Sequence, residues 1–273
     1  MSFDSREFSL ANAQPVRLYR FSRGALEWRY NTSDRAITHD GQVYETVLGG
    51  ISDNGIRMSG DPQADMLIIM GPADLSVAEL FRGSAPSDSI DLVVFDTHYS
   101  EPEARLSWRG SIASVDWPTL NSCRISCQSM DVQMQQPGLT MTYSRGCTAV
   151  LGDGRCKVNL STLRQVITDQ AVDSVKITSG TVAQFYDDWF TGGYVEWPVG
   201  GGQFDRRHIE RHTGSQLVML GGTWGVPATG ELRVYPGCDF LIGTCANKFN
   251  NTANFRGIPH LQGSSPFDGD SPF

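Results

Sequence analysis

The chain has 273 residues, 40% of them hydrophobic and 19% charged, with a formal net charge of −8. This length allows one large or two modest domains, each with its own core, and the acidic balance argues against a basic groove that neutralises nucleic-acid phosphates. The first residues lack the basic start and apolar core of a signal peptide, and no apolar run reaches membrane-spanning length. We therefore expect a protein made in the cytosol, without a membrane anchor.

The first half of the chain has the pattern of an antiparallel sheet. Short apolar or alternating runs separated by turn residues predict strands, and they lie at 16–21, 67–70, 90–95, 106–108 and 123–127. The best helical pattern is PADLSVAELF at 72–81, with Asp74 as the expected N-cap and Leu75, Val77 and Leu80 on one face. We expect an N-terminal β-barrel domain over residues 1–130.

The second half repeats this pattern after a connector over 131–160, which is rich in Met and Gln near its start and carries the first pair of cysteines. Strands are predicted at 166–177, 180–189, 193–197, 208–212, 216–220 and 231–235. They predict a second small β-barrel over 161–236. The C-terminal segment, 237–273, carries the second cysteine pair and ends in GSSPFDGDSPF, which is typical either of a disordered tail or of an arm that docks Phe267 and Phe273 on a neighbour. The predicted fold class is mainly β with two barrel domains.

Four cysteines form two short clips, Cys147 with Cys156 and Cys238 with Cys245. Glycines and an Asp-Gly turn accompany each clip, so both sulfurs of a pair can turn toward one point. The spacing is too long for the CxxC knuckles of common zinc ribbons and leaves room for an iron–sulfur cluster. Thiols stay reduced in the cytosol, which favours metal ligation over disulfides. Arg145 and Arg155 flank the first pair, and we expect them to offset the negative charge of four thiolates.

Other candidate residues carry weaker signals. Cys123 and Cys127 are four residues apart in an alternating run, which predicts packing inside the first barrel. His208, Glu210 and His212 alternate, so on a regular strand they face one way and could hold a metal; the motif is not HExxH. His260 follows the last cysteine and could either pack on a cluster or lie at the surface. Two alternatives stay open for the clips: a zinc-binding interaction module, and a cysteine hydrolase with Cys147 as nucleophile.

Two stretches around the clips have specific features. They are GLTMTYSRGCTAVLGDGRCKVNL and VYPGCDFLIGTCANKFNNTANFRGIPHLQG, with the Leu-Gly-Asp…Arg-Cys turn, the Tyr-Pro-Gly-Cys-Asp start, the Thr-Cys…Phe-Asn run and the Asn-Phe-Arg-Gly-x-Pro-His end. In these features the chain resembles the tail hub proteins of siphophages and gene transfer agents, relatives of the tail tip protein L of phage lambda. The N-terminal half resembles them through VRLYRFSRGALEWRYNTSD, DGQVYETV and WRGSIASVDW. Ile258 stands where the family pattern has Phe, which affects local packing alone.

The resemblance implies a structural hub rather than an enzyme. In that family each subunit carries two tube-protein-like β-barrels, and a homotrimer adapts the sixfold tail tube to a threefold tip. A [4Fe-4S] cluster on Cys147, Cys156, Cys238 and Cys245 is implied by position. Implied partners are the distal tail protein, the tape measure protein and other tail tip or fibre-bearing proteins, with DNA passing through the lumen without specific binding. The implied location is the tail tip or baseplate of a virion assembled in the bacterial host cytoplasm.

Overall fold

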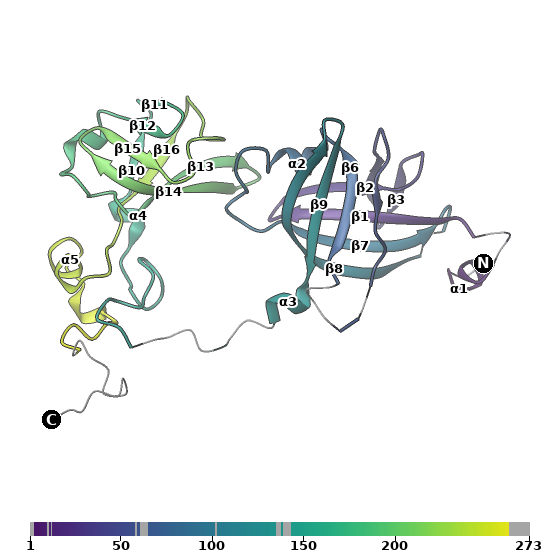
Figure 1. Cartoon of the computed structure of the whole chain (residues 1–273), viewed down its shortest axis with the longest axis horizontal. Coiled ribbons are helices and arrows are strands. Elements are labelled where there is room, and N and C mark those ends of the chain that lie inside the picture. Colours follow the sequence, from purple (N-terminus) through teal and green to yellow (C-terminus); the bar gives the residue numbers. More distant parts are fainter. Residues whose placement is uncertain are drawn as a thin grey trace. The chain divides into compact units, whose positions relative to one another are not determined.

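The computed structural model describes residues 3–9, 11, 13–57, 59–60, 65–101, 103–134, 138 and 143–261 (Figure 1). The chain divides into two compact units, which we call unit 1 (residues 1–136 and 198–205) and unit 2 (137–197 and 206–273). Each unit is built around one sheet, and the mainly β class predicted above is confirmed. The predicted division into four segments stays a prediction, and the C-terminal tail with Phe267 and Phe273 lies outside the described residues.

Unit 1 contains a nine-stranded sheet in the order β3-β4-β2-β1-β7-β8-β9-β6-β5. All its strand pairs are antiparallel except β2 with β4. In Figure 1 the long strands curve around the core. The elements up to residue 134 are α1 Phe3–Glu7, β1 Pro15–Arg23, β2 Leu26–Asn31, β3 Ile37–His39, β4 Gln42–Thr46, β5 Ser52–Asp53, β6 Leu67–Pro72, α2 Ser76–Glu79, β7 Asp91–His98, β8 Ala104–Thr119, β9 Ser122–Ser129 and α3 Met130–Met134.

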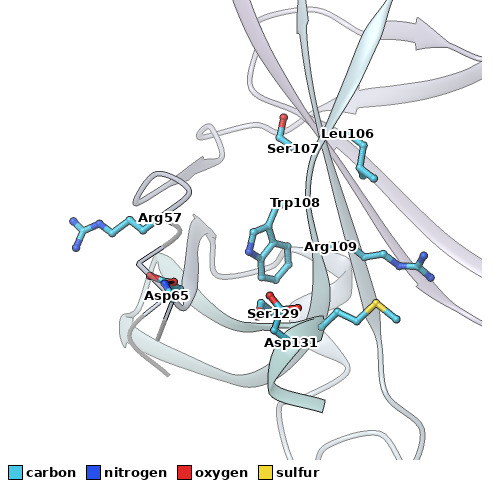
Figure 2. Close-up of a pocket in the computed structure, with 10 residues that line it drawn as sticks. Arg57, Asp65, Leu106, Ser107, Trp108, Arg109, Ser129 and Asp131 are labelled. Carbon is cyan, nitrogen blue, oxygen red and sulfur yellow. Dashed lines mark hydrogen bonds between the residues drawn. The ribbon is translucent and has the colours of Figure 1, made fainter. Parts of the chain in front are cut away.

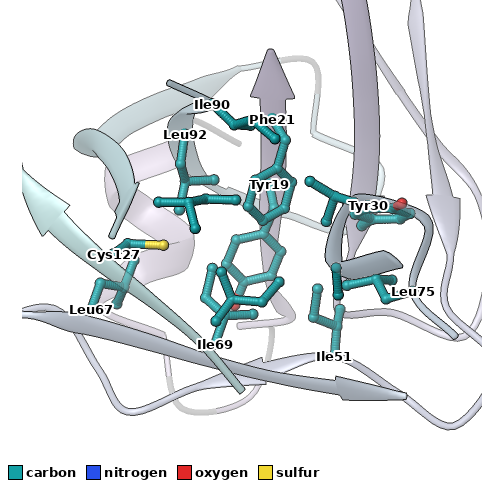
Figure 3. Packing of buried hydrophobic residues seen from close by; sticks show 14 of the residues in the cluster. Tyr19, Phe21, Tyr30, Ile51, Leu67, Ile69, Leu75, Ile90, Leu92 and Cys127 are labelled. Carbon is teal, nitrogen blue, oxygen red and sulfur yellow. The ribbon is translucent and has the colours of Figure 1, made fainter. Parts of the chain in front are cut away.

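The core of unit 1 lies against one face of this sheet (Figure 3). Alternating residues of β1 enter it because successive side chains of a strand point to opposite faces; Tyr19 and Phe21 are both fully buried. Phe21 stands opposite Trp28 on β2 and opposite Leu92 on β7. Cys123 and Cys127 belong to the same cluster and are fully buried, which confirms that they pack inside the sheet.

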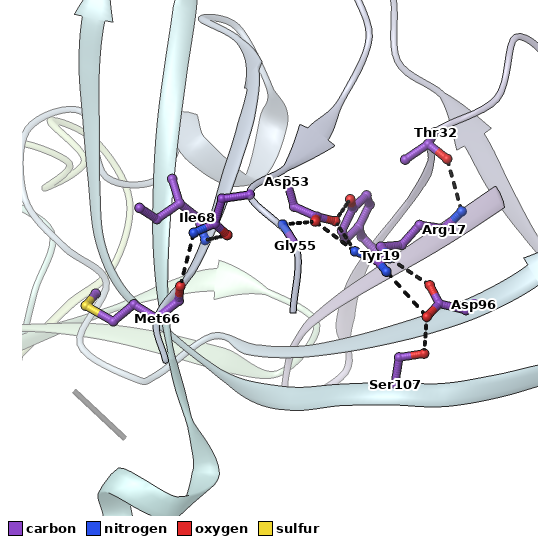
Figure 4. Close-up of polar contacts among 10 residues, drawn as sticks. Arg17, Tyr19, Thr32, Asp53, Gly55, Met66, Ile68, Asp96 and Ser107 are labelled. Atoms are coloured by element: carbon purple, nitrogen blue, oxygen red, sulfur yellow. Dashed lines mark hydrogen bonds and ion pairs between the residues drawn. The ribbon is translucent and has the colours of Figure 1, made fainter. Parts of the chain in front are cut away.

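A polar network joins four strands of the unit 1 sheet (Figure 4). The Arg17 guanidinium on β1 donates to Asp53 Oδ1 of β5 and to Asp96 Oδ1 of β7, both at 2.7 Å. Tyr19 donates its hydroxyl to Asp53 Oδ2 at 2.5 Å, and Ser107 of β8 donates to Asp96 Oδ2 at 2.5 Å. The short strand β5 is therefore fixed to β1 by charged hydrogen bonds as well as by backbone pairing with β6.

The predicted helix at 72–81 is much shorter than expected. Only Ser76–Glu79 is helical, and its N-cap is Leu75, without a side-chain cap, rather than Asp74. The preceding residues cannot join the helix because Pro72 still pairs with Ser122 in the sheet and Ala73 donates its N–H to Asn121 O.

Unit 2 holds most of a seven-stranded sheet in the order β10-β16-β13-β14-β15-β12-β11. The elements from residue 160 onward are α4 Leu160–Leu163, β10 Gln165–Ile167, β11 Ala171–Val172, β12 Lys176–Thr178, the 3-10 helix η1 Val182–Gln184, β13 Tyr194–Gly200, β14 Gln203–Thr213, β15 Gln216–Met219, β16 Leu232–Tyr235, α5 Ile242–Asn247 and the 3-10 helix η2 Thr252–Asn254. Fully buried residues of this unit include Ile167, Ile177, Phe190, Val195, Ile209, Leu217, Leu232 and Val234.

The strand predicted at 180–189 is wrong. This segment forms η1 and turns instead, because the Asp169 carboxylate and the Ser179 hydroxyl accept hydrogen bonds from backbone N–H groups at its start. Side-chain acceptors of this kind compete with a strand ladder for the same donors. The run predicted as one strand at 166–177 is likewise divided among β10, β11 and the first part of β12.

Candidate metal centre

The structure brings the four clip cysteines into one neighbourhood of unit 2. Burial raises the pKa of the Cys245 thiol, and the negative charges of Cys147, Cys156 and Cys238 raise it further. Burial also raises the pKa of Cys238, with smaller contributions from Asp239, Cys156 and Cys147. All six cysteines of the chain are free thiols. That these four cysteines bind one group together stays a prediction.

The first clip is shaped by one carboxylate. Asp153 accepts N–H hydrogen bonds from Cys156 at 2.6 Å, Arg155 at 2.9 Å and Val150 at 3.1 Å. These bonds, led by the one from Cys156, hold the pKa of Asp153 below its usual range. Gly152 before it has a φ of +84°, a backbone conformation that costs glycine little. The turn leaves Cys156 buried, at 8% exposure.

The second clip begins where β16 ends. Gly237 packs so closely on the backbone of residues 191–193 that a Cβ would lie 1.8 Å from Thr191 O, so only glycine fits before Cys238. Asp239 then accepts from Leu241 N at 2.9 Å and from Thr244 Oγ1 at 2.8 Å, which shapes the entry into α5. Cys245 lies in this helix and is buried at 8% exposure.

Three of the four sulfurs accept N–H hydrogen bonds. Phe240 N donates to Cys238 Sγ and Arg256 N donates to Cys147 Sγ, each at 3.4 Å. Asn251 Nδ2 reaches Cys156 Sγ at 3.7 Å and also donates to the Cys156 carbonyl at 2.6 Å. Donors of this kind spread the charge of a thiolate and orient it toward a metal. Asn251 is the site residue that the sequence analysis missed; its place in the quoted signature is the signal that could have found it.

The chain after α5 is tied to the chain that leads into Cys147. Ile258 N donates to Ser144 O at 2.8 Å, and Arg145 Nε donates to Leu261 O at 2.7 Å. Gly257 lies directly against Gly146, since a Cβ on Gly257 would be 2.5 Å from Gly146 O. Cys147 N in turn donates to Phe240 O at 2.8 Å. The two clips are therefore joined by backbone contacts.

The other sequence candidates do not join this site. The Arg145 side chain donates to Leu261 O, and the Arg155 side chain donates to Asp153 and to the carbonyl of residue 148. None of these three bonds is directed at a sulfur. His260 is exposed. A β-bulge between Ile209 and Arg211 breaks the alternation of β14, which leaves His208 and Glu210 exposed.

Beyond this bulge His212 is fully buried, with its ring edge-on to Phe190 and its Nε2 bonded to Gly214 O. The three residues therefore do not share one face, and the one-faced strand predicted for them is wrong. The physical reason is that one extra residue on the bulged strand reverses the side-chain parity beyond it.

Three further observations concern metal-binding groups, a pocket and membrane-spanning helices. Within the described residues, no three His, Cys, Asp or Glu side chains form a group that could hold a metal ion as they stand. The pocket shown in Figure 2, of about 560 Å³, lies in unit 1 and is lined by Arg57, Asp65, Trp108, Arg109 and Asp131 among others. None of the predicted site residues lines that pocket. No helix in the described part of the chain is long and apolar enough to cross a membrane.

Comparisons with known proteins match both halves of the chain. The family model described as "Baseplate hub protein, N-terminal attachment domain" matches residues 10–159, and the model described as "Phage conserved hypothetical protein BR0599" matches residues 188–265. An uncharacterised protein of Xylella fastidiosa (strain 9a5c) is 25% identical over 195 residues, covering 62% of this chain and 40% of that protein. This chain thus spans less than half the length of that relative.

A solved structure shares the fold over nearly the whole chain. It is a chain of the "Virion of native gene transfer agent (GTA) particle", with a TM-score of 0.77 and 22% sequence identity, and the match covers 99% of this chain and 97% of that one. At this identity the likeness establishes the fold.

Proposed function

This chain belongs to the baseplate hub family with an N-terminal attachment domain, and we propose that it is the structural hub of a phage or phage-like tail, with a [4Fe-4S] cluster on Cys147, Cys156, Cys238 and Cys245. The structural hub role in a virion tail follows from the family. The cluster is the finer part of the proposal. It rests on four free thiols that lie on two distant clips and on the backbone contacts that join these clips, from Cys147 N to Phe240 O and between Gly257 and Gly146.

The donor set fits a [4Fe-4S] cluster. Four cysteine sulfurs are the usual ligands of such clusters, and three of these sulfurs accept N–H hydrogen bonds. A single zinc ion would take the same four ligands, so the identity of the metal separates the proposal from the zinc-module alternative.

The role that we propose for this site is mechanical. Its ligands lie on either side of the segment from β10 to β16, so binding one group to all four closes a loop of about 80 residues. Closure of this kind removes conformations mainly from the unfolded chain. The bound group would therefore hold the two ends of this segment together while the hub bears load.

The assembly that we propose is a homotrimer. Three copies with two sheets each present six sheets, which adapts a sixfold tail tube to a threefold tip. Its neighbours would be the distal tail protein, the tape measure protein and fibre-bearing tip proteins. The net charge of −8 suits a ring through which DNA slides without binding. Native mass spectrometry of the purified chain tests this: three copies support it, and a monomer at assembly concentrations contradicts it.

Metal analysis of anaerobically purified protein tests the cluster. We expect about four irons and four acid-labile sulfides per chain, the stoichiometry of a cubane, with a brown visible spectrum. Cys238→Ser should lose the iron, whereas Cys123→Ala, which removes a core thiol of unit 1, should keep it. One zinc and no sulfide would replace the cluster with the zinc-module alternative. Protein free of metal and sulfide would refute both.

A further inference from the structure

Lys248 is held beside the second clip by two backbone carbonyls. It is the C-cap residue of α5, three positions after Cys245. Its Nζ donates to Trp189 O at 2.5 Å and to Gly237 O at 2.7 Å. The same Nζ lies 4.8 Å from the centre of the Trp189 ring, within cation–π range. Gly237 directly precedes Cys238, so this ammonium is bonded to the backbone that positions a ligand.

The position of Lys248 is costly for a cation unless negative charge is near. Burial lowers the pKa of Lys248 to about 8, and the charges of Cys238, Asp239 and Asp188 oppose that change. An ammonium withdrawn from water is stable in its charged form only when it is paired or well hydrogen-bonded. Two carbonyls provide the hydrogen bonds. Asp239 and Asp188 provide negative charge, and an ionised Cys238 would add to it.

The arginines expected from the sequence to balance the thiolates are occupied elsewhere. Arg145 bonds the carbonyl of Leu261, and Arg155 pairs with Asp153 within its own turn. Four ionised thiols in one place require a compensating charge close by, because like charges in a partly buried site repel strongly. Lys248 is a cation whose own hydrogen bonds tie it to the clip.

We propose that Lys248 is both the positioning residue for Cys238 and the counter-charge of the thiolate site. It would hold the Gly237 carbonyl in place and so set the direction in which the chain runs from β16 to Cys238. Its ammonium would stabilise a ligated, negatively charged cluster. This inference rests on the proposed function in its second part, the counter-charge. The positioning part concerns the chain alone.

Three variants separate the two parts. Lys248→Met removes the charge and the hydrogen bonds but keeps the aliphatic stem. Lys248→Gln removes the charge and keeps an N–H donor. Lys176→Met makes the same charge change on β12 and serves as the matched control.

The first measurement is amide hydrogen exchange of residues 237–241 in metal-free protein. We expect Lys248→Met to exchange severalfold faster there than wild type, with Lys248→Gln closer to wild type and Lys176→Met unchanged. Equal exchange in Lys248→Met and Lys176→Met would overturn the positioning role. If Lys248→Met does not fold, Lys248→Gln decides the same question. Exchange intermediate in rate, faster than in Lys176→Met, supports the positioning role, and exchange equal to that of Lys176→Met overturns it.

The second measurement is the midpoint potential of the loaded protein, followed by its visible spectrum. Both Lys248→Met and Lys248→Gln should shift it to more negative values, because a nearby cation favours the reduced cluster. Lys248→Arg, which keeps the charge, should lie near wild type. A potential that is the same in all variants would refute the counter-charge role. Wild-type protein without iron would refute the cluster and this role with it, while the exchange measurement would still decide the positioning.

Discussion

The core of unit 1 and the cysteine region of unit 2 are stabilised in different ways. In unit 1 a large cluster of buried apolar side chains lies against one sheet. Around the four clip cysteines, many apolar side chains stay exposed, among them Phe240, Leu241 and Ile242 at 43%, 57% and 41%. There the loops are joined instead by backbone hydrogen bonds and glycine contacts.

The two regions therefore depend on different sources of stability. Apolar burial is a property of the chain alone and scales with the area removed from water. Loops with little buried apolar surface gain much less from folding, so their order depends more on a bound group. We therefore expect unit 1 to be stable without metal and the cysteine region to gain stability when its ligand binds.

The largest expected effect is in the core of unit 1. Phe21→Ala removes a fully buried ring that packs edge-on against Tyr30, and such substitutions lower the free energy of unfolding by about 3–5 kcal/mol. Urea denaturation followed by tryptophan fluorescence measures it, with the exposed Leu120→Ala as control. Iron content should not change. Loss of iron in Phe21→Ala would show that the two regions are not independent.

The next effect depends on pH. Burial tends to raise the pKa of Asp53, but hydrogen bonds from Arg17, Tyr19 and Gly55 outweigh it and hold the pKa below its usual range. A carboxyl with a lowered folded pKa stabilises the protein above its ordinary value of about 3.9, and the stabilisation disappears as pH falls through the folded pKa.

Asp53→Asn should therefore cost about 1.5–3 kcal/mol at neutral pH, the usual range for charged hydrogen bonds. The difference between variant and wild type should shrink as the pH is lowered below about 4. Denaturation curves between neutral and acid pH measure this. A difference that does not change with pH would mean that the Asp53 charge has no part in holding β5.

A smaller effect on stability, but one specific to the cysteine region, is expected for Gly257→Ala. The added methyl would meet Gly146 O, so the segments that contain residues 146 and 257 must move apart. We expect this to lower the free energy of unfolding by about 1–3 kcal/mol. Gly243→Ala is the matched control, because its Cβ meets nothing within 4 Å and it lies in α5. Iron retention during dialysis should fall in the first variant and not in the second. Equal retention would remove the proposed role of this backbone contact.

The smallest effect is expected at the surface of unit 1. Arg124 and Asp116 form an ion pair at 2.8 Å on β9 and β8, with nearly half of each side chain exposed. Exposed pairs contribute about 0.2–1 kcal/mol and are weakened by salt. Arg124→Ala should therefore lower the free energy of unfolding by less than about 1 kcal/mol. A loss as large as that of Phe21→Ala would mean that surface charge, rather than burial, stabilises this sheet.

Local patterns predicted the class and many strands but not their limits. The predicted run at 16–21 lies inside β1, and the run at 90–95 begins one residue before β7, because such short patterns need no distant partner to be recognised. The failures at 180–189 and at the helix predicted for 72–81 both come from contacts with distant residues. At 180–189, Asp169 accepts hydrogen bonds from backbone N–H groups that a strand ladder needs. At the other segment, pairing of Pro72 with Ser122 keeps the backbone in the sheet, so the helix begins later.

Residue type and spacing are enough to predict the mainly β class, the burial of Cys123 and Cys127, and the four cysteines as candidate ligands. They do not predict which groups support those four cysteines. Asn251 reaches Cys156, Gly257 meets Gly146 and Lys248 bonds Gly237. The quoted signature points to Asn251 without giving its partner, because such contacts form only when different loops meet in the tertiary structure.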